Sequence, residues 1–415
     1  MQSSPLINTS DPLIESRVSE TLPELNTLLD KIRRVDLAKY AEALRPGMHP
    51  VCQIPDDASS LLRGGMNVHI PVTFNDGTKW LARVRQQNTA YPVAGQAKHM
   101  IMHSEIETMR VLKAAGIKVP NAFAPTNVEP GFQGIDFFFV EFVDGSACNA
   151  PVAEGALTQE QQSVLIHSIA AFYVGLSELT FLGVGSLVRD PSTTKCNVGP
   201  LISLDFCSDE SPFFFGPFQS SAHKYLAHIE HILSEISRGR AFTENAAEVY
   251  VTHLWLKDLL HDSKHFWEEG PTYIKHADDK GDQIMIDADG HITGVVDWEW
   301  AYTASKSEAF AAPLALVDVK AFFDGSNELS VNEERLVNAY EALGRPDLAT
   351  CVRNGKVHQR LLMVIGQEPD VLQLHALEHA LTKEKGVEET TGEWVAGMLN
   401  KYKDDVNLRK LRRLP

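Results

Sequence analysis

The sequence lacks several features that would assign it to a specialised class. Its 415 residues include five cysteines at scattered positions, with no Cys-x-x-Cys pair. Such a set offers neither a disulfide framework nor a zinc site, and it is typical of a reducing compartment. No apolar run reaches the length of about 18 residues that a membrane helix needs. The start of the chain also lacks the basic residues and apolar core of a signal peptide. We therefore expect a soluble, cytoplasmic protein with no membrane partner.

Positive charge is also scarce. Lys and Arg total 38 against 55 Asp and Glu, which gives a formal net charge of −17. Nucleic-acid binding needs basic surface that displaces counterions, so we expect no nucleic-acid partner. A nucleotide is not excluded, because Lys, Arg and Mg²⁺ can reverse the field inside one cleft. A cationic, hydroxyl-rich substrate would suit the charge, although net charge does not locate a pocket.

The sequence does contain a compact pattern of strands around one helix. Apolar residues alternate from Met66 to Phe74, which predicts a half-buried strand. Pro71 predicts an edge position or a bulge within it, because proline cannot donate a ladder hydrogen bond. The Asn-Asp-Gly turn that follows predicts a hairpin with residues 80–86. A helix over 98–115 and a second hairpin over 123–143 complete an antiparallel sheet with one helix.

Helical patterns flank this sheet on both sides. An apolar stripe over residues 22–44 predicts one or two amphipathic helices, which we expect to pack as a lid on the next lobe. A Thr-Gln-Glu-Gln capping box at Thr158 opens a long helical region, and residues 182–220 look like an ordered insertion. Further helices are predicted at 226–236, 249–266, 307–323, 331–343, 347–366, 370–384 and 390–401. We expect three parts: an N-terminal helical extension, 1–60; an N-lobe, 61–145; and a helical C-lobe with the catalytic loop and acceptor region, 146–415. The oligomeric state stays open.

The most informative stretch runs from His276 to Glu299. It contains His-x-Asp-x4-Gln, one residue away from the His-x-Asp-x4-Asn spacing of the kinase catalytic loop. Asp278 is the candidate catalytic base, which would accept the proton of a substrate hydroxyl. His276 would support the loop from inside. Each residue alone is more often structural, so the prediction depends on their combination.

Asp297 ends an apolar strand that a hairpin connects to the Asp278 loop. A carboxylate there is a good Mg²⁺ ligand, because Mg²⁺ prefers hard oxygen donors; the alternative is a helix N-cap. Gln283 occupies the position of a second metal ligand, and its amide oxygen can still coordinate Mg²⁺. Lys280 could neutralise the transferring phosphoryl group, or it could form a surface ion pair with Asp279 or Asp282.

The first lobe carries two candidate phosphate-binding groups. Arg83 lies in the middle of the second strand, where a kinase has its phosphate-binding Lys. Arg stays charged and binds phosphate in a bidentate manner. Glu105, in the following helix, is its natural ion-pair partner. The alternative is a surface Arg and an unrelated acid on the helix.

Two backbone segments complete the predicted nucleotide site. Gly64 and Gly65 open the first strand pair, where glycine lets the backbone approach phosphates closely. Glu141, Phe142 and Val143 end a strand and begin the connection to the second lobe. Their main-chain groups could bind an adenine edge, which requires no particular side chain.

Together these motifs resemble the aminoglycoside phosphotransferase family. The resemblance rests on His276-Ala277-Asp278, on Ile284–Asp287 and on Gly294–Glu299, and it extends over residues 60 to 320. Within the family the chain looks like the divergent fungal members, which carry Asp-Asp-Lys-Gly-Asp in the loop and Arg on the strand. The resemblance implies an α+β, two-lobe protein-kinase-like fold, with a small antiparallel β N-lobe and a larger, mainly helical C-lobe. It also implies an ATP- and Mg²⁺-dependent phosphotransferase acting on a hydroxyl of a small-molecule metabolite, which the helical part would hold.

Two other functions stay open. The Gln at position 283, where the family has Asn, would suit a weak or inactive kinase-fold protein that serves as a binding module. The fold could also support non-phosphoryl chemistry on a hydrophobic metabolite, with Asp278 as acid or base. Trp298, Glu299 and Trp300 could line the acceptor pocket, or they could provide core packing and a buried ion pair.

Overall fold

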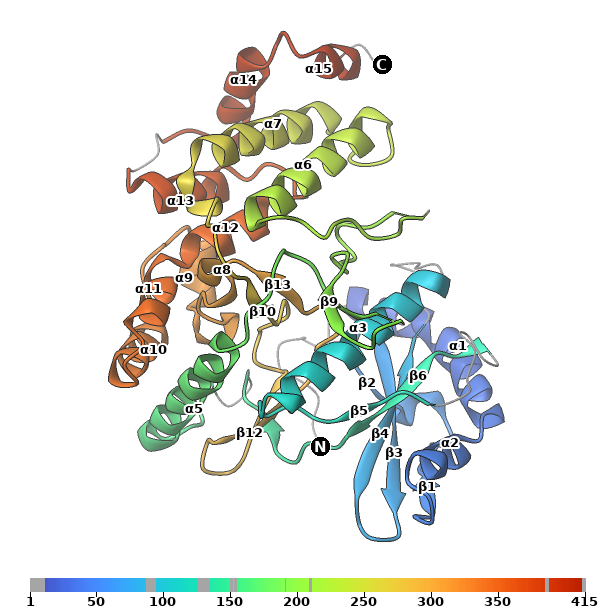
Figure 1. Ribbon diagram of the computed structural model, residues 1–415. Coiled ribbons are helices and arrows are strands. Elements are labelled where there is room, and N and C mark those ends of the chain that lie inside the picture. The colour runs from blue at the N-terminus through green and yellow to red at the C-terminus, as the bar shows by residue number, and fades with distance from the viewer. Residues whose placement is uncertain are drawn as a thin grey trace.

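The computed structural model describes residues 12–86, 95–125, 134–149, 152, 155–190, 192–208, 211–384 and 388–412, with side chains from residue 22 onward. A lobe built on an antiparallel sheet packs beside a larger helical lobe (Figure 1). The predicted α+β, two-lobe fold is therefore confirmed. The proposed boundaries at residues 60 and 145 stay predictions. No helix in the described part of the chain has the length and apolar character needed to cross a membrane.

The sheet of the first lobe has the strand order β1-β3-β4-β6-β5, and β2 pairs with β3 beside β1. Its strands are β1 (Pro50–Cys52), β2 (Leu62–Arg63), β3 (Asn67–Phe74), β4 (Lys79–Arg85), β5 (Ala122–Phe123) and β6 (Phe137–Glu141). Burial alternates along β3 as the sequence predicts, and Gly77 takes a φ of 86° in the β3–β4 turn. The second predicted hairpin, over 123–143, has its expected turn at Pro130-Gly131, which lies outside the described residues.

The prediction for Pro71 was wrong. Strand β3 is an interior strand, and its pairing with β4 runs through Pro71 and Leu81 without a register shift. On the other side, β1 pairs with residues 72–74 and β2 with residues 68–69. Pro71 lies between these two short partners, so an interior strand accommodates a residue that lacks an N–H donor.

The sheet separates two hydrophobic cores. On β6, Phe137 and Phe139 pack into a core with helices α1 (Pro12–Arg34) and α2 (Leu37–Leu44). The alternate residues Phe138 and Val140 pack into a second core with α3 (Gly95–Ala114) and the helical lobe. This period of two is the side-chain alternation of a strand. The predicted helices over 22–44 therefore exist and share a core with the sheet.

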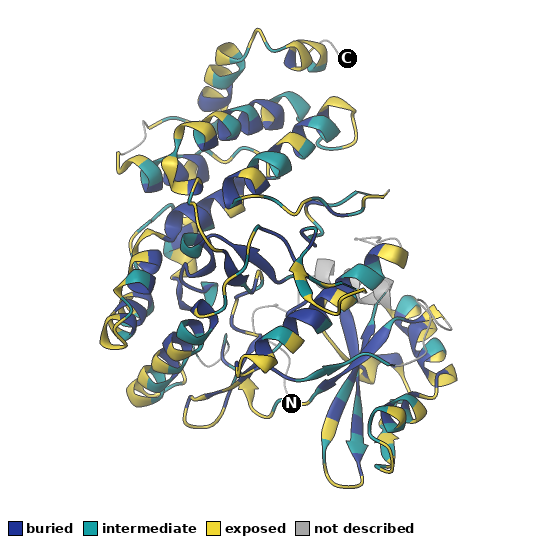
Figure 2. Cartoon of the chain, in the orientation of Figure 1, coloured by how far each residue is buried: buried dark blue, intermediate teal, exposed yellow. Residues whose placement is uncertain are grey.

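The helical lobe begins with the predicted capping box, in which Thr158 Oγ1 accepts the Gln161 N–H and Gln161 Oε1 accepts the Thr158 N–H. Figure 2 shows its helices with buried inner faces and exposed outer faces. The helices are α5 (Gln159–Ser177), α6 (Ser221–Ser237), α7 (Ala246–Asp262), α8 (Lys306–Ala309), α9 (Val319–Phe323), α10 (Val331–Ala342), α11 (Pro346–Asn354), α12 (Lys356–Val364), α13 (Val371–Thr382), α14 (Thr391–Lys401) and α15 (Val406–Leu411). Single 3₁₀ turns are η1 (Ala58–Ser60), η3 (Lys264–Phe266) and η4 (Leu314–Leu316).

Two long helix predictions were wrong. The segment predicted as a helix over 307–323 contains α8, η4 and α9, because Pro313 cannot continue a helix. The segment predicted over 347–366 divides at Gly355 into α11 and α12. A Cβ at Gly355 would lie 2.8 Å from Ala311 Cβ, so the close approach of two segments requires glycine there.

Short strands of the second lobe position the predicted catalytic segments. They are β7 (Ser146–Ala147), β8 (Leu187–Arg189), β9 (Cys196–Val198), β10 (Tyr273–Lys275), β11 (Ile284–Ile286), β12 (Ile292–Val295) and β13 (Tyr302–Ala304). Strand β11 pairs with β12 and β7, and β10 pairs with β13. The Asp278 loop therefore connects β10 to β11, and Asp297 lies in the connection from β12 to β13. These two pairings bring segments about twenty residues apart to the same side of the lobe.

Candidate functional site

His276 connects the two segments that carry the predicted carboxylates. Its Nε2 lies 2.8 Å from the carbonyl oxygen of Val296, the residue before Asp297. A carbonyl only accepts, so the Nε2 carries the proton. The buried ring also packs against Trp298, with 4.6 Å between the ring centroids. The imidazole therefore supports the loop from inside, the position that the sequence predicts for it.

Gln283 stabilises the same loop through its amide. Its Oε1 accepts a hydrogen bond from the Gly281 N–H at 2.8 Å, and its main-chain carbonyl accepts from the Val296 N–H at 2.9 Å. The side chain is buried. One lone pair of Oε1 thus serves the backbone, so a metal would have to use the other. The predicted metal role of Gln283 stays a prediction.

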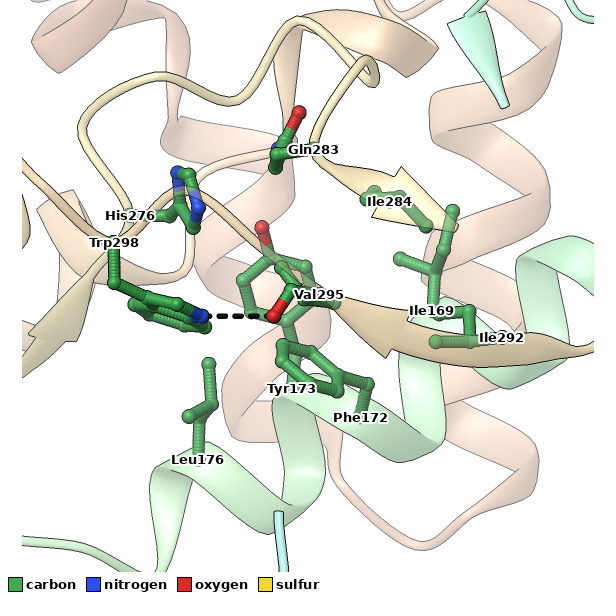
Figure 3. A pocket seen from close by; sticks show the side chains of 10 residues that line it. All are labelled: Ile169, Phe172, Tyr173, Leu176, His276, Gln283, Ile284, Ile292, Val295 and Trp298. Carbon is green, nitrogen blue, oxygen red and sulfur yellow. Dashed lines mark hydrogen bonds between the residues drawn. The ribbon is translucent and has the colours of Figure 1, made fainter. Parts of the chain in front are cut away.

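A small cavity lies behind the loop, and Figure 3 shows the side chains that surround it, with Trp298 Nε1 donating to the Val295 carbonyl. His276 and Gln283 cover it, above apolar side chains from α5, β11 and β12. Its volume of about 10 Å³ is close to the minimum for a single water. This space belongs to the packing that supports the loop and is too small for a substrate.

Asp278 lies on the open side of the loop. Its side chain is 39% exposed, and Lys280 Nζ lies 3.2 Å from its Oδ1. Burial raises the pKa of Asp278, an effect that the Lys280 ammonium opposes. Lys280 also lies 3.9 Å from Asp282, so the surface ion pair considered for Lys280 exists together with its contact to Asp278.

The pKa of Lys280 depends on several charges around the loop. Burial on its own would lower the pKa of Lys280, but the negative charges of Asp278, Asp282 and Asp297 raise it. The charges of the two predicted carboxylates therefore both act on this cation. Sequence reasoning considered Asp282 only as a partner of Lys280 and missed its contribution to this acidic cluster.

Asp297 has an unusual backbone. Its φ is 64°, a left-handed conformation that is uncommon outside glycine and that clusters at functional sites. No helix begins at Asp297, since a turn and β13 follow it, so the N-cap alternative was wrong. Its side chain is 48% exposed and forms an ion pair with Arg83. Burial favours a higher pKa for Asp297, yet the charges of Arg83 and His276 lower it.

Arg83 is the centre of a buried ion-pair network between the lobes. Its Nε lies 3.2 Å from Glu105, so the structure contains the ion pair that the sequence predicts. Its Nη2 contacts both Asp297 and, at 3.2 Å, Glu299. Its Nη1 donates to His69 Nε2 at 3.2 Å. Burial raises the pKa of Glu105 to about 7, although Arg83 opposes this shift. Whether Arg83 and Glu105 hold a nucleotide stays a prediction.

Glu299 joins the same network from the helical lobe. The buried carboxylate forms ion pairs with Arg83 and Arg85, and it accepts a hydrogen bond from Asn67 Nδ2 at 2.8 Å. Trp298 is buried as well. The sequence left open whether Trp298, Glu299 and Trp300 line a pocket or belong to the core. Trp298 packs in the core and Glu299 forms a buried ion pair, whereas Trp300 lines a cleft.

The glycines of the first lobe lie at the tip of the β2–β3 turn. The Gly64 N–H donates to the Asn67 carbonyl at 3.0 Å, and Gln86 Nε2 donates to the Gly64 carbonyl at 2.8 Å. Gly64 and Gly65 are exposed, with open space where a Cβ would stand. The next residue, Met66, lines the cleft that contains Asp278. The turn therefore borders that cleft, and its contact with phosphates stays a prediction.

The predicted adenine-binding segment lines a different cleft. Glu141, Phe142 and Val143 border a space of about 490 Å³ together with the end of α3 and residues 116–120. The lining residues of this space include neither Asp278 nor Asp297. The N–H groups of Glu141 and Phe142 donate to the carbonyls of Asn121 and Lys79. Sequence reasoning did not foresee these bonds, and the adenine role of the segment stays a prediction.

The cleft beside Asp278 has a volume of about 940 Å³. Its lining comes from residues 201–206, from α6, from Leu362 on α12 and from residues 365–367, together with Lys280 and Trp300. Of these residues, sequence reasoning singled out Lys280 and Trp300. No short-range signal marks the other segments, because they come together only through tertiary packing.

Comparison with known proteins agrees with this geometry. A scan against protein families matches residues 91–304, just over half of the chain, to the phosphotransferase enzyme family, APH. A search of curated proteins found no match. This family match supports a small-molecule phosphotransferase, whereas the affinity to fungal members stays a prediction.

Similar solved structures include three enzymes. A thermostable mutant of aminoglycoside phosphotransferase APH(4)-Ia is 13% identical, with 88% of this chain and 98% of that chain covered and a TM-score of 0.39. Macrolide 2'-phosphotransferase MphH from Brachybacterium faecium is 13% identical, with 84% and 99% covered and a TM-score of 0.39. Plasmodium vivax ethanolamine kinase is 13% identical, with 82% and 85% covered and a TM-score of 0.45. At these values the likeness carries no argument about activity or substrate. The match over residues 91–304 is what assigns the family, and by it the chain belongs to the phosphotransferase enzyme family.

Proposed function

We propose that the protein transfers a phosphoryl group from ATP, with Mg²⁺, to a hydroxyl of a small-molecule metabolite. One observation carries the proposal: the His276–Val296 hydrogen bond joins the two segments that carry Asp278 and Asp297, and both carboxylates are partly exposed. Phosphoryl transfer needs one carboxylate near the attacking hydroxyl and another near the phosphate-bound metal. The family match supports the same chemistry.

Asp278 would act as the base. The acceptor oxygen forms a bond to the γ-phosphorus, the bond from that phosphorus to the bridging oxygen breaks, and ADP leaves. The hydroxyl proton passes to Asp278, whose raised pKa makes it a better proton acceptor than an ordinary carboxylate. Lys280, 3.2 Å from Asp278, would stabilise negative charge on the transferring group. His276 would hold the loop in place.

The residues present fit Mg²⁺. Asp297 offers a half-exposed carboxylate with a lowered pKa, and Gln283 offers a neutral amide oxygen, which are the hard donors that Mg²⁺ prefers. When bound, the metal would neutralise negative charge on the nucleotide phosphates. Arg83 already contacts Asp297 and Glu105. Its proposed role is to orient Asp297 and to offer its guanidinium to the phosphates that approach from the Gly64-Gly65 turn.

The test compares three variants in two measurements. Asp278→Asn should bind Mg²⁺·ATP normally by calorimetry but lose transfer to a panel of hydroxylated metabolites by about 10²–10⁴-fold. Asp297→Asn should weaken Mg²⁺·ATP binding itself. Asp289→Asn is the matched control, because Asp289 is an exposed acid on the β11–β12 turn of the same segment. Equal transfer by the wild type and by Asp278→Asn would contradict the proposal.

A second candidate is a kinase-fold protein that binds a ligand without phosphoryl transfer. One observation favours it: the Gln283 amide oxygen is buried and bonded to the loop backbone, where the family has Asn. A melting temperature that Mg²⁺·ATP leaves unchanged would favour this candidate over the kinase. Transfer of phosphate to any acceptor in the metabolite panel would exclude it.

A further inference from the structure

The walls of the cleft beside Asp278 are mainly apolar. One side is formed by residues 201–206, a second by α6 and residues 241–242, and a third by Leu362 near the end of α12 together with residues 365–367. The larger apolar side chains of the lining include Leu201, Ile202, Phe206, Phe242, Trp300 and Leu362. A cleft of about 940 Å³ lies within the range of small-molecule sites, which have apolar walls and a few placed polar groups.

The lysines that line this cleft are already paired. Lys224 forms an ion pair with Glu308, Lys275 lies 3.5 Å from Asp279, and Lys280 lies 3.2 Å from Asp278. Each of these pairs is close to neutral overall, so together they give the cleft little net charge.

The carboxylates of the wall follow the same rule. Glu235 lies 3.2 Å from Arg238 and 3.6 Å from Arg240. Among the described lining residues, Asp205 is the one carboxylate with no ion pair recorded, and it is exposed at the surface. A polycationic acceptor would need several unpaired carboxylates facing it. The lining of the cleft therefore does not reflect the net charge of −17 of the whole chain, and it offers little attraction to a cationic acceptor.

We propose that the acceptor is an uncharged alcohol with a largely apolar body. Its hydroxyl would lie at Asp278, with its body between Ile202, Phe206 and α12, beside the Trp300 ring. This inference rests on the proposed phosphotransferase function, because that function places the hydroxyl at Asp278. Burying such a body gains about 25 cal/mol for each Å² of apolar surface removed from water, with no charge to desolvate.

Binding is tested with the uncharged naphthalene dye Prodan, whose fluorescence changes in an apolar site. Borneol, a bicyclic alcohol, should displace Prodan at concentrations at least tenfold lower than 2-deoxystreptamine, a cationic aminocyclitol, or myo-inositol, an uncharged polyol. Leu362→Asp should weaken Prodan and borneol binding at least tenfold. The control is Met363→Asp, its neighbour on α12, which does not line the cleft and should stay within twofold. Leu362 and Met363 are 44% and 36% exposed, so both variants should fold.

A second variant approaches the cleft from another segment. Phe242→Asp should also weaken Prodan binding, and Asp tolerates the positive φ of 52° at this position better than most residues. Preferential binding of 2-deoxystreptamine, or Prodan binding that Leu362→Asp leaves unchanged, would overturn the proposal. A transfer assay with Mg²⁺·ATP separates the two hypotheses. Phosphorylation of 2-deoxystreptamine but not of borneol would support the phosphotransferase function and contradict the apolar acceptor. Borneol binding without transfer to any acceptor would support the apolar site and contradict the phosphotransferase function.

Discussion

The buried carboxylate of Glu308 yields a quantitative test of how Lys224, a residue that lines the cleft beside Asp278, is held in place. Glu308 forms an ion pair with Lys224 and accepts hydrogen bonds from Ser221 Oγ at 2.6 Å and Tyr302 Oη at 2.7 Å. Both charged side chains are almost fully buried. Burial favours a higher pKa for Glu308, but Lys224 and Ser221 hold the pKa well below its ordinary range. The carboxylate is therefore ionised in the folded protein.

Glu308→Gln keeps the shape but leaves the Lys224 ammonium without a counter-charge. Breaking a buried pair in this way costs about 3–5 kcal/mol. The loss of stability also has an upper limit, because the folded variant can deprotonate Lys224 instead of keeping its charge buried. With an ordinary lysine pKa of about 10.4, that costs about 4.6 kcal/mol at pH 7 and about 1.9 kcal/mol at pH 9. The lysine pKa is then lower in the folded than in the unfolded variant, so its stability rises with pH over this window. The deficit should shrink by up to about 2.7 kcal/mol between pH 7 and pH 9.

Urea unfolding followed by circular dichroism at both pH values measures this deficit. The double variant Lys224→Met/Glu308→Leu removes both charges and should recover most of the loss. Asp324→Asn removes a partner of an exposed pair, Lys320–Asp324 at 3.5 Å, and should change stability by less than about 1 kcal/mol. A loss in Glu308→Gln below about 1 kcal/mol at pH 7, or an equal loss at both pH values, would refute the reasoning.

Three further changes test the catalytic loop. Lys280→Met removes the cation that lowers the pKa of Asp278, so the acid limb of the plot of kcat/KM against pH should move to higher pH. An acid limb that stays in place would show that Asp278 is not the group that titrates. Gly281→Ala should destabilise the fold by about 1–3 kcal/mol in urea unfolding. The reason is that Gly281 has a φ of 98° and that a Cβ there would stand 2.8 Å from the Cβ of Ala315. An unchanged urea midpoint would contradict this reasoning. Gln283→Leu leaves the Gly281 N–H without its acceptor and should cost about 1–3 kcal/mol in the same assay, whereas a neutral result would mean that the bond does not hold the loop.

Local patterns predicted the elements that local physics determines. Alternation along β3, the turn at Gly77 and the capping box at Thr158 each depend on neighbouring residues, and the structure contains all three. The ion pair of Arg83 with Glu105 was also foreseeable, because a strand and the next helix pack together. Pro71 and Pro313 show the limit of local reasoning. Proline removes a donor in both places, but tertiary pairing decides whether the element tolerates it or ends.

Contacts between segments far apart in the chain could not be predicted from the sequence. Arg83 and Asp297 are separated by 214 positions, and their ion pair follows from the way the two lobes meet. The position of the cleft beside Asp278 is of the same kind, because residues 201–206, α6 and Leu362 show no mutual pattern in the sequence. The motifs of the sequence therefore suggested Asp278 as the base and Asp297 as the metal ligand, but they did not predict the walls of this cleft.

The position of Glu299 has a consequence for motion between the lobes. This carboxylate belongs to the helical lobe, while both of its cations, Arg83 and Arg85, belong to strand β4 of the sheet lobe. Swinging the lobes apart would separate this carboxylate from both guanidinium groups at once, so the two ion pairs favour the arrangement in which the lobes are in contact. The lobes should therefore move together as one body, with little large-scale opening between them.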